Sequence, residues 1–325
     1  MLNLKEMLAL HSQIKMNVKN LFNILIIFFC LFNSIHSKEL KIKVKISNEI
    51  ITNIDIINEK SYLAFLNPGL KKLPLNKQES IAKNSLIKEI IKKKELKKYF
   101  NINKDYPFVD AIEKDLLKRK GFLNKSEFKN FLKKNNLDYS LIREKLKLEA
   151  LWNQLIFEKY SKSVKINKKL LKKRISKEIK NSNSKYQYNL SEILFENNLS
   201  IGFEKTYKKI KNSIDSIGFE NTANIYGISN SSKNGGQIGW INETQIDDEL
   251  RNKINNIKIG EITKPIKIPN GYLILKLNDK KEIIEKLDIE KELKKLVNLE
   301  KNKQLNNFSI IFYKRLKQNI IINEY

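Results

Sequence analysis

The stretch Gly235-Gly-Gln-Ile-Gly-Trp240 decides the fold of this chain. Its paired glycines, Gly235 and Gly236, permit backbone angles that are closed to other residues. On its own, the pattern also fits a turn in any small sheet domain. Its meaning therefore depends on the sequence on either side.

Glycine divides the 325 residues into three parts. Eight of the ten glycines fall between Gly202 and Gly271, and the flanks are rich in Lys, Leu, Ile and Glu. Glycine-poor flanks favour helices, whereas the middle favours turns between strands. The sequence predicts an α+β protein, with a helical region, an α/β domain and a helical tail.

Further segments of the middle region follow one another in a recognisable order. They are Tyr188–Phe195, Ala223–Tyr226, Gly260–Ile266 and Asn270–Lys276. Thr263–Ile268 is short and apolar with a proline near its start, which suits an edge strand. Asn270-Gly271 is a hairpin signal that leads into the next strand. With the glycine motif, these segments resemble the parvulin family of peptidyl-prolyl isomerases over residues 186–280.

The resemblance assigns the polar positions of an active site. Active parvulins place a histidine on the first strand and another on the last, and these positions hold Glu192 and Leu273 here. The central loop position, usually Cys or Asp, holds Ser229. Leu273 cannot hydrogen-bond, so the polar network is largely replaced. The alternative is that Glu192 and Ser229 are only structural polar residues.

The resemblance also implies an apolar slot for the proline ring at Ile238, Ile246 and Leu250. Isomerisation breaks no bond, and an apolar slot favours the twisted, less polar amide. With the slot kept and the polar groups replaced, we expect weak isomerase activity at best, and a peptide-binding role. Whether the chain is an enzyme stays open at this point.

The flanks carry helical and strand patterns. Leu40–Ile46 alternates apolar residues with lysine, which predicts a half-buried strand that pairs with Ile320–Ile322. Thr52 and Asp55 resemble a capping box. Helical spacing places Trp152 in the core. Helices are predicted over 52–66, 75–100, 108–120, 125–135, 139–161, 167–180 and 282–317.

The N-terminal segment resembles a secretory signal peptide. Lys15 and Lys19 precede the apolar run Leu21–Phe32, and the small residue Ser37 follows. The run is too short to span a bilayer comfortably. We expect cleavage after Ser37 from a start at Met1 or Met16, and no stable membrane anchor afterwards. The alternative is an uncleaved anchor.

Removal of residues 1–37 would also remove Cys30, His11 and His36, the only cysteine and histidines of the chain. The mature protein would then have no disulfide, no Cys or His nucleophile and no thiolate or imidazole metal site. We therefore expect neither a metal nor a cofactor.

The formal charge of +27 comes from 63 Lys and Arg against 36 Asp and Glu. A basic chain suggests nucleic acid or anionic lipid as a partner. The lysines are spread along the whole length, however, which favours a solvated surface. We expect no nucleic-acid partner, and an exported protein does not meet the chromosome.

The flanks extend the resemblance to the SurA family of periplasmic chaperones for outer-membrane proteins. The predicted division is 1–37 signal peptide, 38–180 helical chaperone domain, 186–280 parvulin-like domain inserted in it, and 281–325 helix and strand packing on the first domain. This chain has one parvulin domain where the best-known members have two.

The SurA resemblance implies a periplasmic chaperone for unfolded outer-membrane protein precursors. The alternatives are an active isomerase for exported proteins and a basic lipid- or nucleic-acid-binding protein. A client surface is expected on the helical block among its phenylalanines, which are Phe100, Phe108, Phe122, Phe128 and Phe131.

Overall fold

The computed structural model describes residues 39–181, 185–196, 202–269, 271–283 and 288–325. The chain divides into Met1–Lys41 and Ile42–Tyr325, and the second part is one compact unit that carries every element named below. The predicted signal peptide lies outside the described residues. Among the described helices, none is long and apolar enough to cross a membrane.

A three-stranded antiparallel sheet brings the two ends of the compact unit together. Its strands, in the order β2-β1-β7, are β1 (Ile42–Ile46), β2 (Glu49–Thr52) and β7 (Ile322–Glu324). Ile46 lies opposite Ile322, and the Tyr325 amide donates to the Lys43 carbonyl at 3.0 Å. The predicted pairing is confirmed, although the last strand begins two residues later than the predicted run.

Helices form the rest of the flanks, and capping side chains fix where several of them start. Thr52 accepts from the Asp55 amide at 3.2 Å, while the Asp55 carboxylate accepts from the Thr52 amide at 2.7 Å, which confirms the capping box. Asn124 accepts from the Glu127 amide at 2.9 Å. The helices are α2 (Asn53–Leu66), α3 (Leu75–Leu96), α4 (Phe108–Arg119), α5 (Lys125–Lys134), α6 (Tyr139–Tyr160), α7 (Lys168–Asn181) and α11 (Ile289–Gln318).

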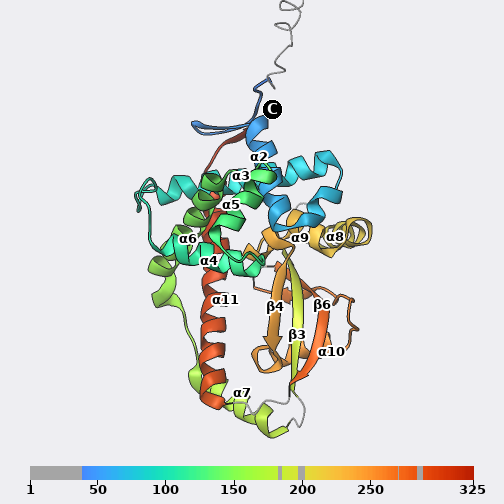
Figure 1. Cartoon of the computed structure of the whole chain (residues 1–325). Coiled ribbons are helices and arrows are strands. Elements are labelled where there is room, and N and C mark those ends of the chain that lie inside the picture. The colour runs from blue at the N-terminus through green and yellow to red at the C-terminus, as the bar shows by residue number, and fades with distance from the viewer. Residues whose placement is uncertain (1–38, 182–184, 197–201, 270, 284–287) are drawn as a thin grey trace, which may run out of the picture. The chain divides into compact units, whose positions relative to one another are not determined.

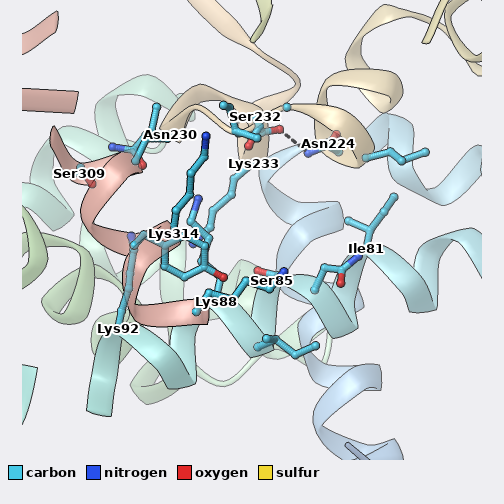
Figure 2. A pocket seen from close by; sticks show the side chains of 18 of the residues that line it. Ile81, Ser85, Lys88, Lys92, Asn224, Asn230, Ser232, Lys233, Ser309 and Lys314 are labelled. Carbon is cyan, nitrogen blue, oxygen red and sulfur yellow. Dashed lines mark hydrogen bonds between the residues drawn. The ribbon is translucent and has the colours of Figure 1, made fainter. Parts of the chain in front are cut away.

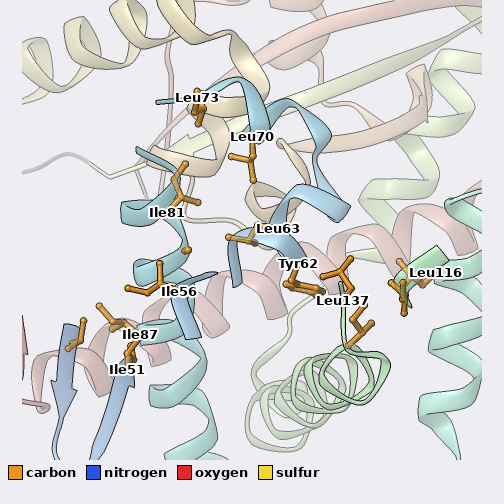
Figure 3. Close-up of a cluster of buried hydrophobic side chains, with 14 of the residues drawn as sticks. Ile51, Ile56, Tyr62, Leu63, Leu70, Leu73, Ile81, Ile87, Leu116 and Leu137 are labelled. Atoms are coloured by element: carbon orange, nitrogen blue, oxygen red, sulfur yellow. The ribbon is translucent and has the colours of Figure 1, made fainter. Parts of the chain in front are cut away.

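The apolar faces of these helices meet in two buried clusters. One of them, shown in Figure 3, includes Ile51, Ile56, Tyr62, Leu63, Leu70, Leu73, Ile81, Ile87, Leu116 and Leu137. The other surrounds Trp152, which is fully buried and stacks on Phe312 of α11 with ring centroids 5.6 Å apart. The Trp152 indole N–H donates to Ser309 Oγ at 2.8 Å. The core position of Trp152 is confirmed, and α11 belongs to the same core.

The predicted start of the last helix at Glu282 is wrong. Strand β6 (Gly271–Ile283) continues through Glu282, which lies opposite Tyr186, and α11 begins only at Ile289. Asp288 caps it by accepting from the Glu290 amide at 2.9 Å. The Lys and Glu residues here favour a helix locally, but pairing along the whole neighbouring strand satisfies the backbone polar groups.

The glycine-rich region folds as a second antiparallel sheet with helices beside it (Figure 1). Its elements are β3 (Lys185–Phe195), α8 (Phe203–Ile217), α9 (Phe219–Tyr226), the 3₁₀ turn η3 (Asn230–Asn234), β4 (Gln237–Asn242), α10 (Asp248–Asn255), β5 (Ile266–Ile268) and β6. The strand order β4-β3-β6-β5 places β5 at an edge, as predicted. A mostly helical chain with two small sheets confirms the α+β class.

Successive residues of β3 face opposite sides of this sheet, and buried residues pack on both sides. Ile193 and Phe195 pack with Ile210 of α8 and Phe219 of α9. Leu190 and Leu194 belong to the cluster on the other face, which also holds Tyr188, Ile246, Ile254, Ile266, Leu273, Leu275 and Leu277. Two of the predicted slot residues, Ile246 and Leu250, belong to or pack against this second cluster.

Candidate functional site

A short chain of hydrogen bonds starts at Glu192 on β3. The Ser231 hydroxyl donates to Glu192 Oε1 at 2.7 Å, and the Ser229 and Ser231 Oγ atoms lie 2.7 Å apart. Ser229 is buried, whereas Glu192 and Ser231 are half-buried. The structure thus brings two predicted site residues together through Ser231, which the sequence reasoning missed. The serines of the stretch Ser229–Ser232 were the available signal.

The glycine motif is what docks this serine loop onto the sheet. The Glu192 amide donates to the Gly236 carbonyl at 2.8 Å. A Cβ atom at Gly236 would lie 2.1 Å from the Glu192 carbonyl oxygen, and its φ of +77° is itself unfavourable for other residues. Close approach of the two backbones therefore requires glycine. The Ser232 hydroxyl, which donates to the Ser229 carbonyl at 2.7 Å, fixes the turn.

The apolar part of the site lies on the same face of the sheet as Glu192. Leu273 lies opposite Leu194, two residues along β3 from Glu192, and is buried. Ile246 is buried in the same cluster, and Leu250 packs against it half-buried. The structure therefore gathers Leu273, Ile246 and Leu250 into one apolar wall. The role of these residues in binding proline stays a prediction.

Ile238 differs from the other slot residues. Its side chain is 40% exposed, and it lies outside the buried cluster that holds Leu273. The neighbouring Trp240 is 42% exposed, with the Lys281 ammonium 4.3 Å from its ring centroid. An exposed isoleucine and tryptophan on β4 are apolar surface that solvent can reach. They could contact a ligand without any rearrangement of the core.

The chemistry open to this site is limited by its side chains. Its polar groups are one carboxylate and two hydroxyls, beside an apolar wall. No group of three or more His, Cys, Asp or Glu in the described parts of the chain could hold a metal ion. Such a site can bind an apolar side chain or a proline ring. It lacks the imidazole pair that the parvulin resemblance implies.

Comparisons with known proteins match this geometry. Residues 201–279 match the Rotamase family, the PPIC-type peptidyl-prolyl isomerase domain. The chaperone SurA of Pseudomonas putida is 24% identical over 162 residues, which are 48% of this chain and 38% of that protein. The foldase protein PrsA 2 of Bacillus anthracis is 28% identical over 224 residues, 66% of this chain and 69% of that protein.

Among solved structures, one of two related SurA-like chaperones from Campylobacter jejuni aligns at 20% identity and a TM-score of 0.34. That alignment covers 87% of this chain and 98% of the other. The match to the Pseudomonas SurA spans well under half of that relative's own length.

The four-stranded sheet, its glycine loop and its apolar face define a parvulin-type domain of the PPIC kind. This chain carries that domain, and with its helical flanks it is SurA-like, as the sequence predicts.

Proposed function

We propose that this protein is an exported chaperone that binds unfolded polypeptides, with a parvulin-type domain whose isomerase activity is weak or absent. The observation that carries the proposal is the buried Leu273, which stands where the resemblance implies a histidine, in one apolar wall with Ile246 and Leu250. A leucine offers no hydrogen bond to orient a prolyl carbonyl. Similarity to the chaperone SurA and the foldase PrsA supports the chaperone role.

Two assays on the full chain test this proposal together. The first follows cis-trans isomerisation of a Xaa-Pro peptide, and the second follows suppression of aggregation of an unfolded β-barrel outer-membrane protein. We expect aggregation to be suppressed at near-equimolar chaperone, with an isomerase kcat/KM at least about 100-fold below that of a parvulin with both histidines. Efficient isomerisation without suppression would favour the alternative, an active isomerase for exported proteins.

Variants of the polar chain separate the two activities further. Glu192→Ala and Ser229→Ala remove the carboxylate and one hydroxyl of the site. If chaperone action depends on apolar contacts, both variants should suppress aggregation as well as the parent does. Any residual isomerase activity should fall in both, because each substitution removes a polar group that could orient the amide.

A candidate client surface lies at the turn between α4 and α5. A hollow of about 960 Å³ opens there, and Leu123 is 90% exposed at its edge. Phe122 packs on Phe131 with ring centroids 5.1 Å apart, and Phe131 is 37% exposed. Phe128 is fully buried and belongs to the core. An exposed apolar edge beside a hollow is the kind of surface that accepts varied apolar segments.

The two other phenylalanines of the predicted surface, Phe100 and Phe108, pack half-buried against the Trp152 cluster. The proposal therefore narrows to the α4–α5 turn. Leu123→Asp should weaken aggregation suppression severalfold without changing the unfolding midpoint, because the side chain is exposed. Asn130→Asp, which adds the same charge at an exposed position of α5, is the matched control. Equal effects of the two variants would remove the turn from the client surface.

Export to the periplasm completes the proposal. The positively charged start, the apolar run and Ser37 support a cleaved signal peptide. N-terminal sequencing of protein recovered from an exporting host should give a mature chain that begins near Lys38. Recovery of an intact Met1 or Met16 would contradict cleavage and favour an uncleaved anchor.

A further inference from the structure

A second cavity lies between α3, α11 and the loop that joins α9 to η3 (Figure 2). It has a volume of about 620 Å³. Five lysines line it, namely Lys88, Lys92, Lys233, Lys314 and Lys317. Among the described residues, Glu196 is the one carboxylate in this lining. The cavity is therefore strongly basic.

Three of these lysines have carboxylate partners. Lys92 and Lys233 both contact the Glu149 carboxylate at 2.7 Å, and Glu149 reaches them from α6. Lys314 contacts Glu196 at 3.0 Å. Two carboxylates thus serve three ammonium groups. The pairing leaves an excess of positive charge around the cavity, even before the remaining lysines are considered.

Lys88 has no such partner. Within the described part of the chain, its ammonium has neither a hydrogen-bond acceptor nor a carboxylate, and it lies 5.7 Å from the Tyr313 ring centroid. Ser85 precedes Lys88 by three residues and so lies on the same face of α3. The Ser85 hydroxyl is buried, and it too has no hydrogen-bond partner among the described residues. Buried polar groups without partners are rare in folded proteins.

The electrostatics of Lys88 agree with this geometry. Burial lowers the pKa of Lys88 to about 7, and the nearby Lys92 and Lys233 ammonium groups lower it further, while Glu149 opposes them. From α11, Tyr313 faces Lys88, and burial raises the pKa of that phenol to about 12, so it stays neutral. An anion placed beside Lys88 would restore its charge.

Apolar side chains form another part of the lining. It includes Leu63, Ile81, Ile87, Ile225, Ile228 and Ile310. An occupant that matches this cavity carries one anionic group and an apolar group next to it. One unpaired ammonium and one unpaired hydroxyl suit the two oxygens of a carboxylate, which accepts charge-assisted hydrogen bonds.

We propose that this cavity binds the carboxylate of a polypeptide client together with the adjoining apolar side chain, and that Lys88 and Ser85 contact the carboxylate. The inference rests on the proposed polypeptide-binding function. One loop joins this cavity to the parvulin-type site, because the loop that presents Ser229 to that site also presents Lys233 to this cavity. A carboxylate can come from the chain terminus or from an Asp or Glu side chain.

Three versions of one short fluorescein-labelled peptide test the inference on the full chain. All end in Leu-Phe, the first with a free carboxylate, the second with an amide, and the third with an amide and a Glu before the last residue. Binding is measured by fluorescence anisotropy at low salt and pH 6.5. The amide without Glu should bind about tenfold or more weakly than the free acid, because a charged hydrogen bond is lost. Recovery of affinity by the Glu version would identify side-chain carboxylates as a second source.

Variants assign the effect to the cavity. Lys88→Met should abolish the difference in affinity between the free-acid and amide peptides, and Ser85→Ala should reduce that difference severalfold. Lys77→Met, at an exposed position on the same helix, should leave it unchanged. Thermal unfolding of Lys88→Met should occur at no lower temperature than for the parent, because the lysine is penalised by burial. This check separates loss of binding from loss of folding.

The outcomes separate this inference from the proposed function. Equal binding of the free acid and the amide would overturn the carboxylate site, yet leave polypeptide binding intact. Failure of every peptide to bind, with no suppression of aggregation, would overturn the proposed function itself. If inorganic phosphate stabilised the parent but not Lys88→Met while the free acid bound no better than the amide, the cavity would be a phosphate site and the inference wrong.

Discussion

Glu149→Gln tests the electrostatics that join the helical core to the parvulin-type domain. Glu149 on α6 contacts the ammonium groups of Lys92 on α3 and of Lys233 on η3, both at 2.7 Å. Burial alone would raise the pKa of Glu149, but the Lys233 and Lys92 ammonium groups hold it well below its usual range. The substitution keeps the shape of the side chain and removes its charge, leaving two ammonium groups without a counter-ion.

The size of the effect follows from burial. Removing one partner of a buried ion pair costs about 3–5 kcal/mol. The Lys92 side chain is only 4% exposed, whereas Glu149 is 37% exposed, so water screens part of the interaction. We therefore expect Glu149→Gln to lower the free energy of unfolding by about 2–3 kcal/mol at pH 7. In urea, that corresponds to a shift of the midpoint by about 1 M.

The pH dependence of the stability of Glu149→Gln gives a second, independent test. Without the carboxylate, the pKa values of Lys92 and Lys233 in the folded variant should fall below the ordinary lysine value. Between the lowered value and about 10.5, the unfolded chain then binds more protons, so the stability of the variant rises with pH. In the parent, burial already lowers the pKa of Lys92, so this lysine contributes a rise in stability to both chains. The Lys233 ion pair of the parent persists over this range, because the Glu149 pKa is low and the Glu149 carboxylate raises the pKa of Lys233 against the effect of burial. The difference in the free energy of unfolding between the parent and Glu149→Gln should therefore narrow from pH 7 to pH 9.5.

Urea unfolding followed by tryptophan fluorescence, to which the buried Trp152 and the exposed Trp240 both contribute, measures both effects. Glu158→Gln, at an exposed position on the same helix, is the matched control and should change stability by less than about 0.5 kcal/mol. The reasoning is refuted if Glu149→Gln costs no more than this control. It is equally refuted if the gap between variant and parent widens as the pH rises.

Three further predictions follow from the fold. Ending the chain at Asn319 removes β7 and should lower the free energy of unfolding in urea by about 2–4 kcal/mol, because apolar packing on the cluster shown in Figure 3 is lost. An unchanged midpoint would contradict the role of the strand pairing. Parent stability should rise from pH 7 to about pH 10, because burial lowers the folded pKa of Lys88 to about 7, and Lys88→Met should flatten the rise in Tm measured across this range. Gly236→Ala should lower the free energy of unfolding by about 2–3 kcal/mol, because the added Cβ would contact the Glu192 carbonyl. Gly239→Ala should lower it less, because φ is also positive there but the space around the Cβ is open.

Much of the fold could be read from local patterns. The glycine cluster places the sheet domain, and the apolar spacing around Trp152 predicts a buried helix face. Period-two alternation at Leu40–Ile46 predicts the strand that pairs with the chain end. Each of these signals works because neighbours in sequence are neighbours in the element. The same logic failed at Glu282, where the strand partner Tyr186 decides the structure and lies far away in sequence.

The sequence by itself determined the domain type, and its resemblance to parvulins predicts site positions at Glu192, Ser229 and Leu273. The glycine motif, which is readable in the sequence, fixes the serine loop against β3. Only the tertiary structure decided that Ser231 bridges the two polar residues, and that Lys88 faces a basic cavity without a partner. The reason is physical. Side-chain contacts between separate helices and loops depend on how their apolar faces pack. The spread of lysines along the sequence therefore does not show which ammonium groups the packing brings together.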